Sequence, residues 1–234
     1  MLELDDLKLD LNINFGSIQF GDLANANDSK DISNSEITHN KPQAVSMKLK
    51  NQHHYRRFTS ETQLETLTDW EFEEGYSYHF LSQGDIDSFS YLKFILRQQK
   101  VNYLIASTWC MANADVEQFE TYLKLGRIQK VDFYVGEIFK GSYIEEYNKL
   151  TELMQKYNGR IAIFRNHSKV YVGFGDKFNF VIESSANINT NPRCENTVIT
   201  LNTDLALFYK DFYDGIISFE RNFDDWQPSR LFIT

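Results

Sequence analysis

The 234-residue sequence predicts an α/β fold in which a mixed β-sheet is flanked by helices. The segments VNYLIAS (101–107) and VDFYVGEI (131–138) are nearly continuous apolar runs, which are typical of strands buried on both faces. Each run follows a stretch whose apolar residues recur at helical spacing. A group of strand-like segments and a last helical pattern then follow. This order predicts one sheet with helices packed against it.

The boundaries of these elements follow from capping patterns and turn residues. Asp87 or Ser88 can accept the first backbone N–H groups of a helix. Ser142 and Glu145 match a capping box, and Gly126 suits a helix end. The predicted helices span 88–99, 115–126, 142–157 and 205–218, and a short helix and turn precede them at 61–75. The other predicted strands span 160–166, 167–174, 178–184 and 196–202, while 77–84 is a strand or a loop.

The N-terminal part, residues 1–58, is predicted to form an arm outside the folded domain of residues 59–234. Apolar and polar residues alternate at the start of 9–20, as in a half-buried strand that lies at an edge or adds to the sheet of a partner protein. Residues 21–58 are rich in Asn, Asp and Ser and poor in large apolar side chains, so they are predicted to be a flexible linker. A protein partner is therefore expected for the arm.

The composition is that of a soluble globular protein, with 42% hydrophobic and 15% aromatic residues. No run approaches the roughly 18 to 20 apolar residues of a membrane span, so no membrane association is expected. The first residues, MLELDDLKLD, are acidic where a secretory signal is basic and then apolar, and we expect a cytoplasmic protein. Cys110 and Cys194 form neither a metal cluster nor a disulfide framework, and buried reduced thiols are expected.

The net charge of −9 is unevenly distributed. Residues 1–87 hold 16 acidic and seven basic side chains, whereas residues 88–234 hold 17 of each. The segment 156–193 is locally basic, and the local field matters more to a phosphate ligand than the total charge does. Its basic residues are Lys156, Arg160, Arg165, Lys169, Lys177 and Arg193.

The candidate site lies between Arg165 and Glu195. His167 and Lys169 occupy alternate positions of the predicted strand 167–174, so their side chains are expected on one face. A turn at Gly175-Asp176 would make this strand and 178–184 a hairpin. The end of the hairpin would then bring a polar cluster to the lysine, formed by Ser184, Ser185, Asn187 and Asn189.

The order of these residues resembles the half-site of the phospholipase D superfamily, whose pattern is HxKxxxxD followed by GSxN. His167 and Lys169 match the HxK part, and Ser185 and Asn187 match the SxN part. Ser184 replaces the glycine, and six residues instead of four separate Lys169 from Asp176. Glu195 falls where the endonuclease-like bacterial members carry a glutamate that orients the histidine. The family's sandwich of helices and a mixed sheet agrees with the predicted element order.

The resemblance implies a role for each residue. His167 would form a covalent phosphoryl intermediate, Lys169 and Asn187 would hold the non-bridging oxygens, and Glu195 would fix the imidazole tautomer. Neither a metal nor another cofactor is needed for this chemistry. The residues expected to bind substrate are Ser184, Ser185, Asn189, Arg193 and Trp109, the last of which follows a buried strand.

The sequence contains a single HxK triplet, whereas the superfamily's active site uses two. The expected assembly is therefore a two-fold homodimer that brings two His167 side chains to one phosphate. The expected function is that of a metal-independent phosphodiesterase, a nuclease acting on DNA rather than RNA. Two alternatives remain: a non-catalytic relative that binds nucleic acid or serves in assembly, and a phosphodiesterase acting on phospholipid.

Overall fold

The computed structural model describes residues 62–68, 71–83, 86–188 and 193–230. The predicted arm, with its strand in 9–20 and its linker 21–58, lies outside these residues, and so does Asn189. No helix among the described residues combines the length and apolar character that crossing a membrane requires.

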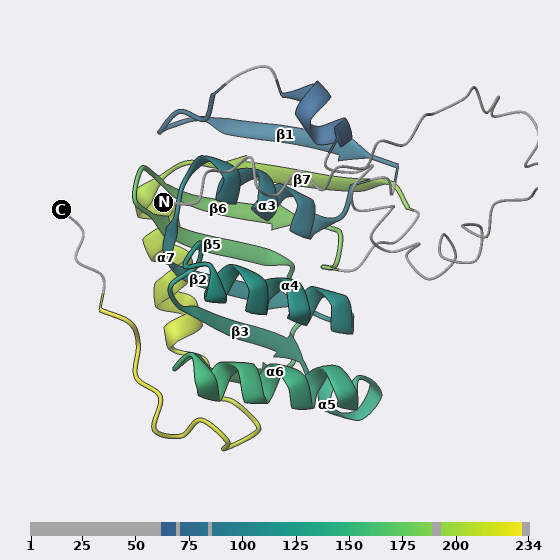
Figure 1. Ribbon diagram of the computed structural model, residues 1–234, viewed down its shortest axis with the longest axis vertical. Helices are drawn as coiled ribbons and strands as arrows, with labels where there is room; N and C mark the ends of the chain where they lie inside the picture. Colours follow the sequence, from purple (N-terminus) through teal and green to yellow (C-terminus); the bar gives the residue numbers. More distant parts are fainter. Residues whose placement is uncertain (1–61, 69–70, 84–85, 189–192, 231–234) are drawn as a thin grey trace, which may run out of the picture. The chain divides into compact units, whose positions relative to one another are not determined.

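A single seven-stranded sheet organises the described chain (Figure 1). Its order is β1-β7-β6-β5-β2-β3-β4. β2, β3 and β4 are parallel to one another, while all other neighbours are antiparallel, so the predicted mixed sheet is confirmed. The strands are β1 (Ser77–Ser82), β2 (Val101–Thr108), β3 (Val131–Gly136), β4 (Ile161–Phe164), β5 (Val170–Gly175), β6 (Asn179–Ser184) and β7 (Glu195–Thr200).

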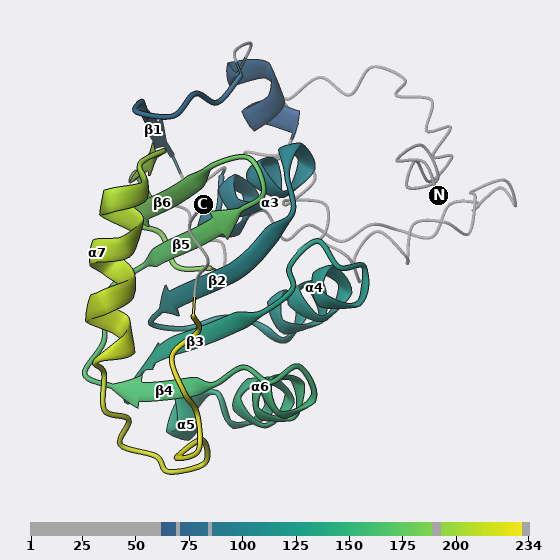
Figure 2. The ribbon, with the colours of Figure 1, turned by 90° about the vertical axis from the view of Figure 1, so that its left-hand side faces the viewer.

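Helices cover both faces of the sheet, as the sequence predicted. Figure 2 shows α3, α4 and α6 on one face and α7 on the other. The helices are α3 (Ser88–Gln98), α4 (Asn113–Lys124), α5 (Phe139–Ser142), α6 (Ile144–Lys156) and α7 (Thr203–Asp214). The larger core lies under α3, α4 and α6, and a smaller core lies between α7 and the middle of the sheet.

Two of the predicted helix ends are confirmed and one is wrong. Asp87 caps α3 by accepting from the backbone N–H of Ser90, and Gly126 after α4 has the positive φ of 64° that favours glycine. The capping box at Ser142 does not form, because Ser142 already belongs to the short helix α5 and its N–H donates to the carbonyl of Ile138. Tyr143 therefore stands at the start of α6, without a side-chain cap.

Helix α7 packs through a different face from the one that its large apolar residues mark. It ends at Asp214, four residues before the predicted end, and its buried residues are Ala206, Lys210 and Tyr213. Phe208 and Phe212 point away from the sheet and are 67% and 58% exposed. Lys210 is buried because it pairs with Asp214 one turn later. The outer surface of α7 thus exposes two large aromatic side chains.

The segment after α7 covers the edge of the sheet at β4. The N–H of Phe219 donates to the carbonyl of Ile163 (2.7 Å), and the N–H of Ile163 donates to the hydroxyl of Ser218 (3.0 Å). Farther along, the Trp226 ring lies 3.7 Å from the Arg160 guanidinium, and its indole N–H donates to the buried carboxylate of Asp132. The tail that the sequence left unassigned therefore completes the polar end of the β3–β4 pair.

Candidate active site

His167 and Lys169 lie in a loop before β5, not on the strand predicted for 167–174. The loop is held by Asn166, which is 5% exposed. Its amide oxygen accepts from the backbone N–H and the hydroxyl of Ser168, and its amide nitrogen donates to the carbonyl of Tyr134. Because a side chain takes up the Ser168 N–H, strand pairing starts only at Val170. The strand prediction was wrong for these three residues.

The loop adjoins the ends of the other central strands. β2 and β3 end here, and because β5 and β6 form an antiparallel hairpin, β6 also ends here while β7 begins here. The direct link is a hydrogen bond from the N–H of Ser184 to the carbonyl of Lys169 (2.9 Å). The hairpin therefore brings Ser184, the first residue of the predicted polar cluster, to the lysine.

The Lys169 ammonium lies against the backbone of its own loop. Nζ donates to the carbonyl of His167 (2.8 Å) and lies 3.3 Å from His167 Nδ1. Lys169 is only 9% exposed, whereas His167 is exposed to solvent. Burial lowers the pKa of Lys169, and the nearby Cys110 thiol and Glu195 carboxylate partly oppose that shift. The imidazole and the ammonium thus form one compact pair at the surface.

The serines and Glu195 form a second part of the site. The hydroxyl of Ser185 donates to the Glu195 carboxylate and accepts from the N–H of Asn196 (3.0 Å). The hydroxyl of Ser184 is engaged with Thr197 and with the backbone N–H of Ala186. In the described part of the chain no hydrogen bond joins Glu195 to His167. The carboxylate acts on the lysine through its charge.

Asn187 is anchored through its backbone. Its carbonyl accepts from the hydroxyl of Ser88 at the start of α3 (2.9 Å), while its side-chain oxygen is buried with no hydrogen bond to the described residues. Arg193, also expected to bind substrate, is exposed two residues before β7.

Trp109 lies beside the histidine, directly after β2. The centroids of the Trp109 and His167 rings are 5.7 Å apart, and Trp109 is half-buried. Gly136, at the end of β3, makes this placement possible. A Cβ at Gly136 would lie 2.7 Å from Trp109 Cδ1 and 3.0 Å from the carbonyl oxygen of Asn166, closer than atoms pack. Trp109 therefore forms one wall of the candidate site.

Three residues that shape this site were not predicted from the sequence. Asn166 and Gly136 position the loop and the tryptophan, and Ser168 links the loop to α7, because its hydroxyl lies 3.0 Å from the hydroxyl of Tyr213. Only Asn166 gave a signal, as a short polar residue at the end of the predicted strand 160–166, which is where α/β proteins place ligand-binding residues, whereas Gly136 and Ser168 lay inside the predicted strands 131–138 and 167–174.

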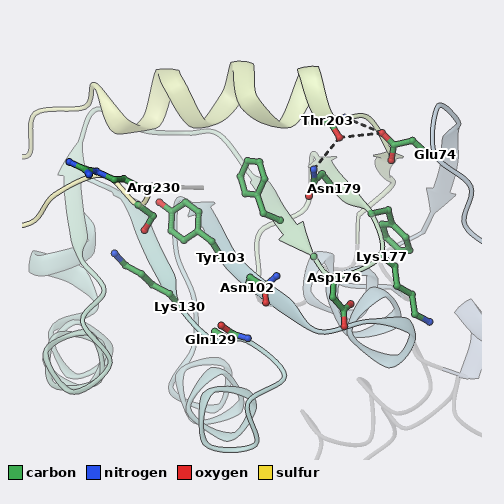
Figure 3. A pocket seen from close by; sticks show the side chains of 14 residues that line it. Glu74, Asn102, Tyr103, Gln129, Lys130, Asp176, Lys177, Asn179, Thr203 and Arg230 are labelled. Atoms are coloured by element: carbon green, nitrogen blue, oxygen red, sulfur yellow. Dashed lines mark hydrogen bonds between the residues drawn. The ribbon is translucent and has the colours of Figure 1, made fainter. Parts of the chain in front are cut away.

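Asp176 lies at the opposite end of β5 from His167, in the hairpin turn (Figure 3). Its carboxylate accepts from the backbone N–H of Lys100, so its role there is structural. Three of the six basic residues of 156–193 do not lie at the site either. Arg160 is buried beside Tyr134, Lys156 pairs with Glu120, and Lys177 lies next to Asp176. Only part of the basic segment predicted from the sequence can therefore contribute to the field around the motif.

Among the described residues, no three His, Cys, Asp or Glu side chains are grouped as a metal site would require. The polar groups that the structure brings together are the His167 imidazole, the Lys169 ammonium, and the Glu195 carboxylate with its Ser185 hydroxyl, whose charge acts on the lysine. This set can bind an anionic oxygen and can transfer a proton.

No protein-family model and no curated protein matches the sequence. Solved structures similar to the chain include polyphosphate kinase from Porphyromonas gingivalis, with a TM-score of 0.47 at 16% identity over 66% of this chain and 26% of that one. NucT from Helicobacter pylori has a TM-score of 0.43 at 18% identity over 59% and 94%. Phosphatidylserine synthase from Haemophilus influenzae Rd KW20 has a TM-score of 0.40 at 14% identity over 58% and 37%. The chain thus spans less than two thirds of the first and third proteins.

Proposed function

We propose that the protein is a metal-independent phosphodiesterase, a nuclease that cleaves DNA through a phosphohistidine at a homodimer interface. The observation that carries this proposal is the pairing of an exposed imidazole with a buried ammonium, His167 Nδ1 to Lys169 Nζ at 3.3 Å. A phosphodiester repels nucleophiles through its anionic oxygens. A fixed cation neutralises that negative charge, and the imidazole beside it supplies the nucleophile.

The chemistry divides into two steps. His167 Nε2 attacks phosphorus while the bond from phosphorus to the leaving oxygen breaks, and that oxygen takes a proton from His167 of the partner subunit. Water then attacks the phosphohistidine, giving its proton to the partner's His167, so both imidazoles return to their first state. Lys169 and Asn187 hold the non-bridging oxygens, and the Glu195 carboxylate accepts a hydrogen bond from His167 Nδ1–H once the ring turns from Lys169, so that Nε2 keeps the lone pair that attacks.

The surface of α7 favours the dimer. Its exposed Phe208 and Phe212 can be removed from water only if another molecule covers them. A second copy of the chain would cover them and would also complete the site. Phe212 precedes Tyr213, whose hydroxyl contacts Ser168 between the two motif residues. Two copies joined through this part of α7 would bring their loops toward each other.

Cleavage of end-labelled DNA in EDTA tests the chemistry, with RNA and phospholipid as parallel substrates. We expect DNA cleavage, and a loss of at least about 100-fold in His167→Ala and in Lys169→Ala. His79→Ala, an exposed histidine on β1, is the matched control and should cleave normally. DNA binding without cleavage would favour the non-catalytic alternative, and cleavage abolished by chelator would contradict the proposed mechanism.

Sedimentation tests the dimer. The double variant Phe208→Glu and Phe212→Glu should be a monomer and should lose the cleavage activity, because one chain carries one half-site. Leu125→Glu provides a matched control, since Leu125 is as exposed as Phe212, at 58%, but lies at the end of α4 on the opposite face. A wild-type monomer with full activity would refute the shared site.

A further inference from the structure

The structure has a second polar site, a groove of about 730 Å³ at the end of the sheet opposite His167. The ends of β5 and β6 that form the Gly175–Asn179 turn line it, together with the start of α7 and the chain before β3. Figure 3 shows Asn102 near its centre, Lys130 and Arg230 to one side and Lys177 to the other. The proposed catalysis uses none of these residues.

Three cations line this groove, Lys130, Lys177 and Arg230. Among the described residues, neither Lys130, Lys177 nor Arg230 forms an ion pair. The two acids of the lining, Glu74 and Asp176, are engaged with the backbone. Glu74 accepts from the N–H and hydroxyl of Thr203, and Asp176 accepts from the N–H of Lys100. Within the described part of the chain the three cationic groups therefore have no ion-pair contact to give up on binding a ligand, although the charge of Lys130 also acts on the buried Asp132 carboxylate.

A local irregularity of the sheet presents an amide to the same groove. The register of β2 on β5 shifts between Val101 and Tyr103, so Asn102 is an extra residue, a β-bulge. Asn102 is exposed although both its neighbours are buried. Bulges redirect side chains next to functional sites. Gln129, also exposed, adds a second free amide in the lining.

We propose that this groove binds a chain of linked phosphates. Its cations come from three separate segments and stand on both sides of the amides, so one small anion cannot reach all of them. A ligand that repeats its charge along its length can. Phosphate oxygens accept from lysine, arginine and amide groups alike. The ligand is either a single-stranded polynucleotide or inorganic polyphosphate, which share this backbone charge. The inference goes beyond the proposed function and does not require cleavage.

Fluorescence anisotropy with the full chain in EDTA tests the inference, in the His167→Ala background. The probes are labelled 20-nucleotide oligothymidylate, polyphosphate and polyglutamate of similar length. The test variant replaces Lys130, Lys177 and Arg230 by Gln. The control variant replaces three exposed lysines of α4 and α6, Lys124, Lys149 and Lys156, and removes the same charge from ion-paired positions.

We expect one of the phosphate chains to bind, and the test variant to bind it at least about tenfold more weakly at low salt. For oligothymidylate, three lost phosphate contacts reduce the slope of log K against log salt by about 2, at roughly 0.7 per contact. The variant Lys130→Arg, Lys177→Arg and Arg230→Lys keeps the three positive charges and should keep the affinity. It therefore separates an effect of lost charge from an effect of misfolding. Equal losses in the control variant, equally tight binding of polyglutamate, or no binding of either phosphate chain would overturn the proposal.

Discussion

Replacing Asn166 by alanine should destabilise the protein and loosen the loop that carries His167 and Lys169. The side chain makes four hydrogen bonds of 3.0 Å or less, to the hydroxyls of Ser107 and Ser168, the carbonyl of Tyr134 and the N–H of Ser168. The two hydroxyls can still pair with each other, since they already lie 2.7 Å apart. The Tyr134 carbonyl and the Ser168 N–H each lose a hydrogen-bond partner, and each loss lowers the free energy of unfolding by about 1 to 3 kcal/mol. Because Ser168 is half-buried, water offsets part of the loss, and we expect about 3 kcal/mol.

Urea unfolding followed by circular dichroism measures this loss. A change of about 3 kcal/mol corresponds to a decrease in Tm of about 6 to 12 °C for a domain of this size. Asn148→Ala, on the exposed side of α6, is the matched control and should stay within about 0.5 kcal/mol of the wild type. Asn166→Asp keeps the acceptor of the Ser168 N–H and should fall between the two. An Asn166→Ala variant as stable as the control would refute the claim that this amide holds the loop.

Three further predictions concern the site and its surroundings. Burial lowers the pKa of Lys169, so the alkaline limb of the pH–rate profile for DNA cleavage should lie below that of an ordinary lysine. Glu195→Gln removes a carboxylate that raises this pKa, so the limb should move to still lower pH, and a shift to higher pH would contradict this sign. Gly136→Ala should cost about 1 to 3 kcal/mol in urea unfolding and change the fluorescence of the displaced Trp109, whereas an unchanged spectrum would refute the close packing. Asp176→Ala should leave the cleavage rate within about twofold and cost less than about 1 kcal/mol, because its carboxylate accepts a single exposed hydrogen bond; a large loss of activity would return it to the site.

The sequence predicted the sheet well where burial alone decides the structure. The apolar runs at 101–107 and 131–138 became β2 and β3, because a continuous apolar segment between helices has no other way to bury both its sides. The prediction failed where a local polar contact competes with the regular pattern. Alternation in 167–174 suggested a strand from His167, and only the side chain of Asn166 decides otherwise.

Part of the site could also be predicted from the sequence. The hairpin brings Ser184 to Lys169 as the turn at Gly175-Asp176 implied, because antiparallel pairing returns the end of one strand to the start of the other. The partner of Glu195 could not be predicted. That contact depends on β7 pairing with β6, a long-range register that no spacing in the chain reveals.

The two borders of the sheet differ in how they can meet another chain. At β4, the contacts of Ser218 and Phe219 with Ile163 occupy main-chain groups that would otherwise be a template for an incoming strand. This border is closed to growth by strand addition. Among the residues that the structure describes, β1 has no strand on its outer side, and its Leu81 is 82% exposed, so this border can accept an incoming strand.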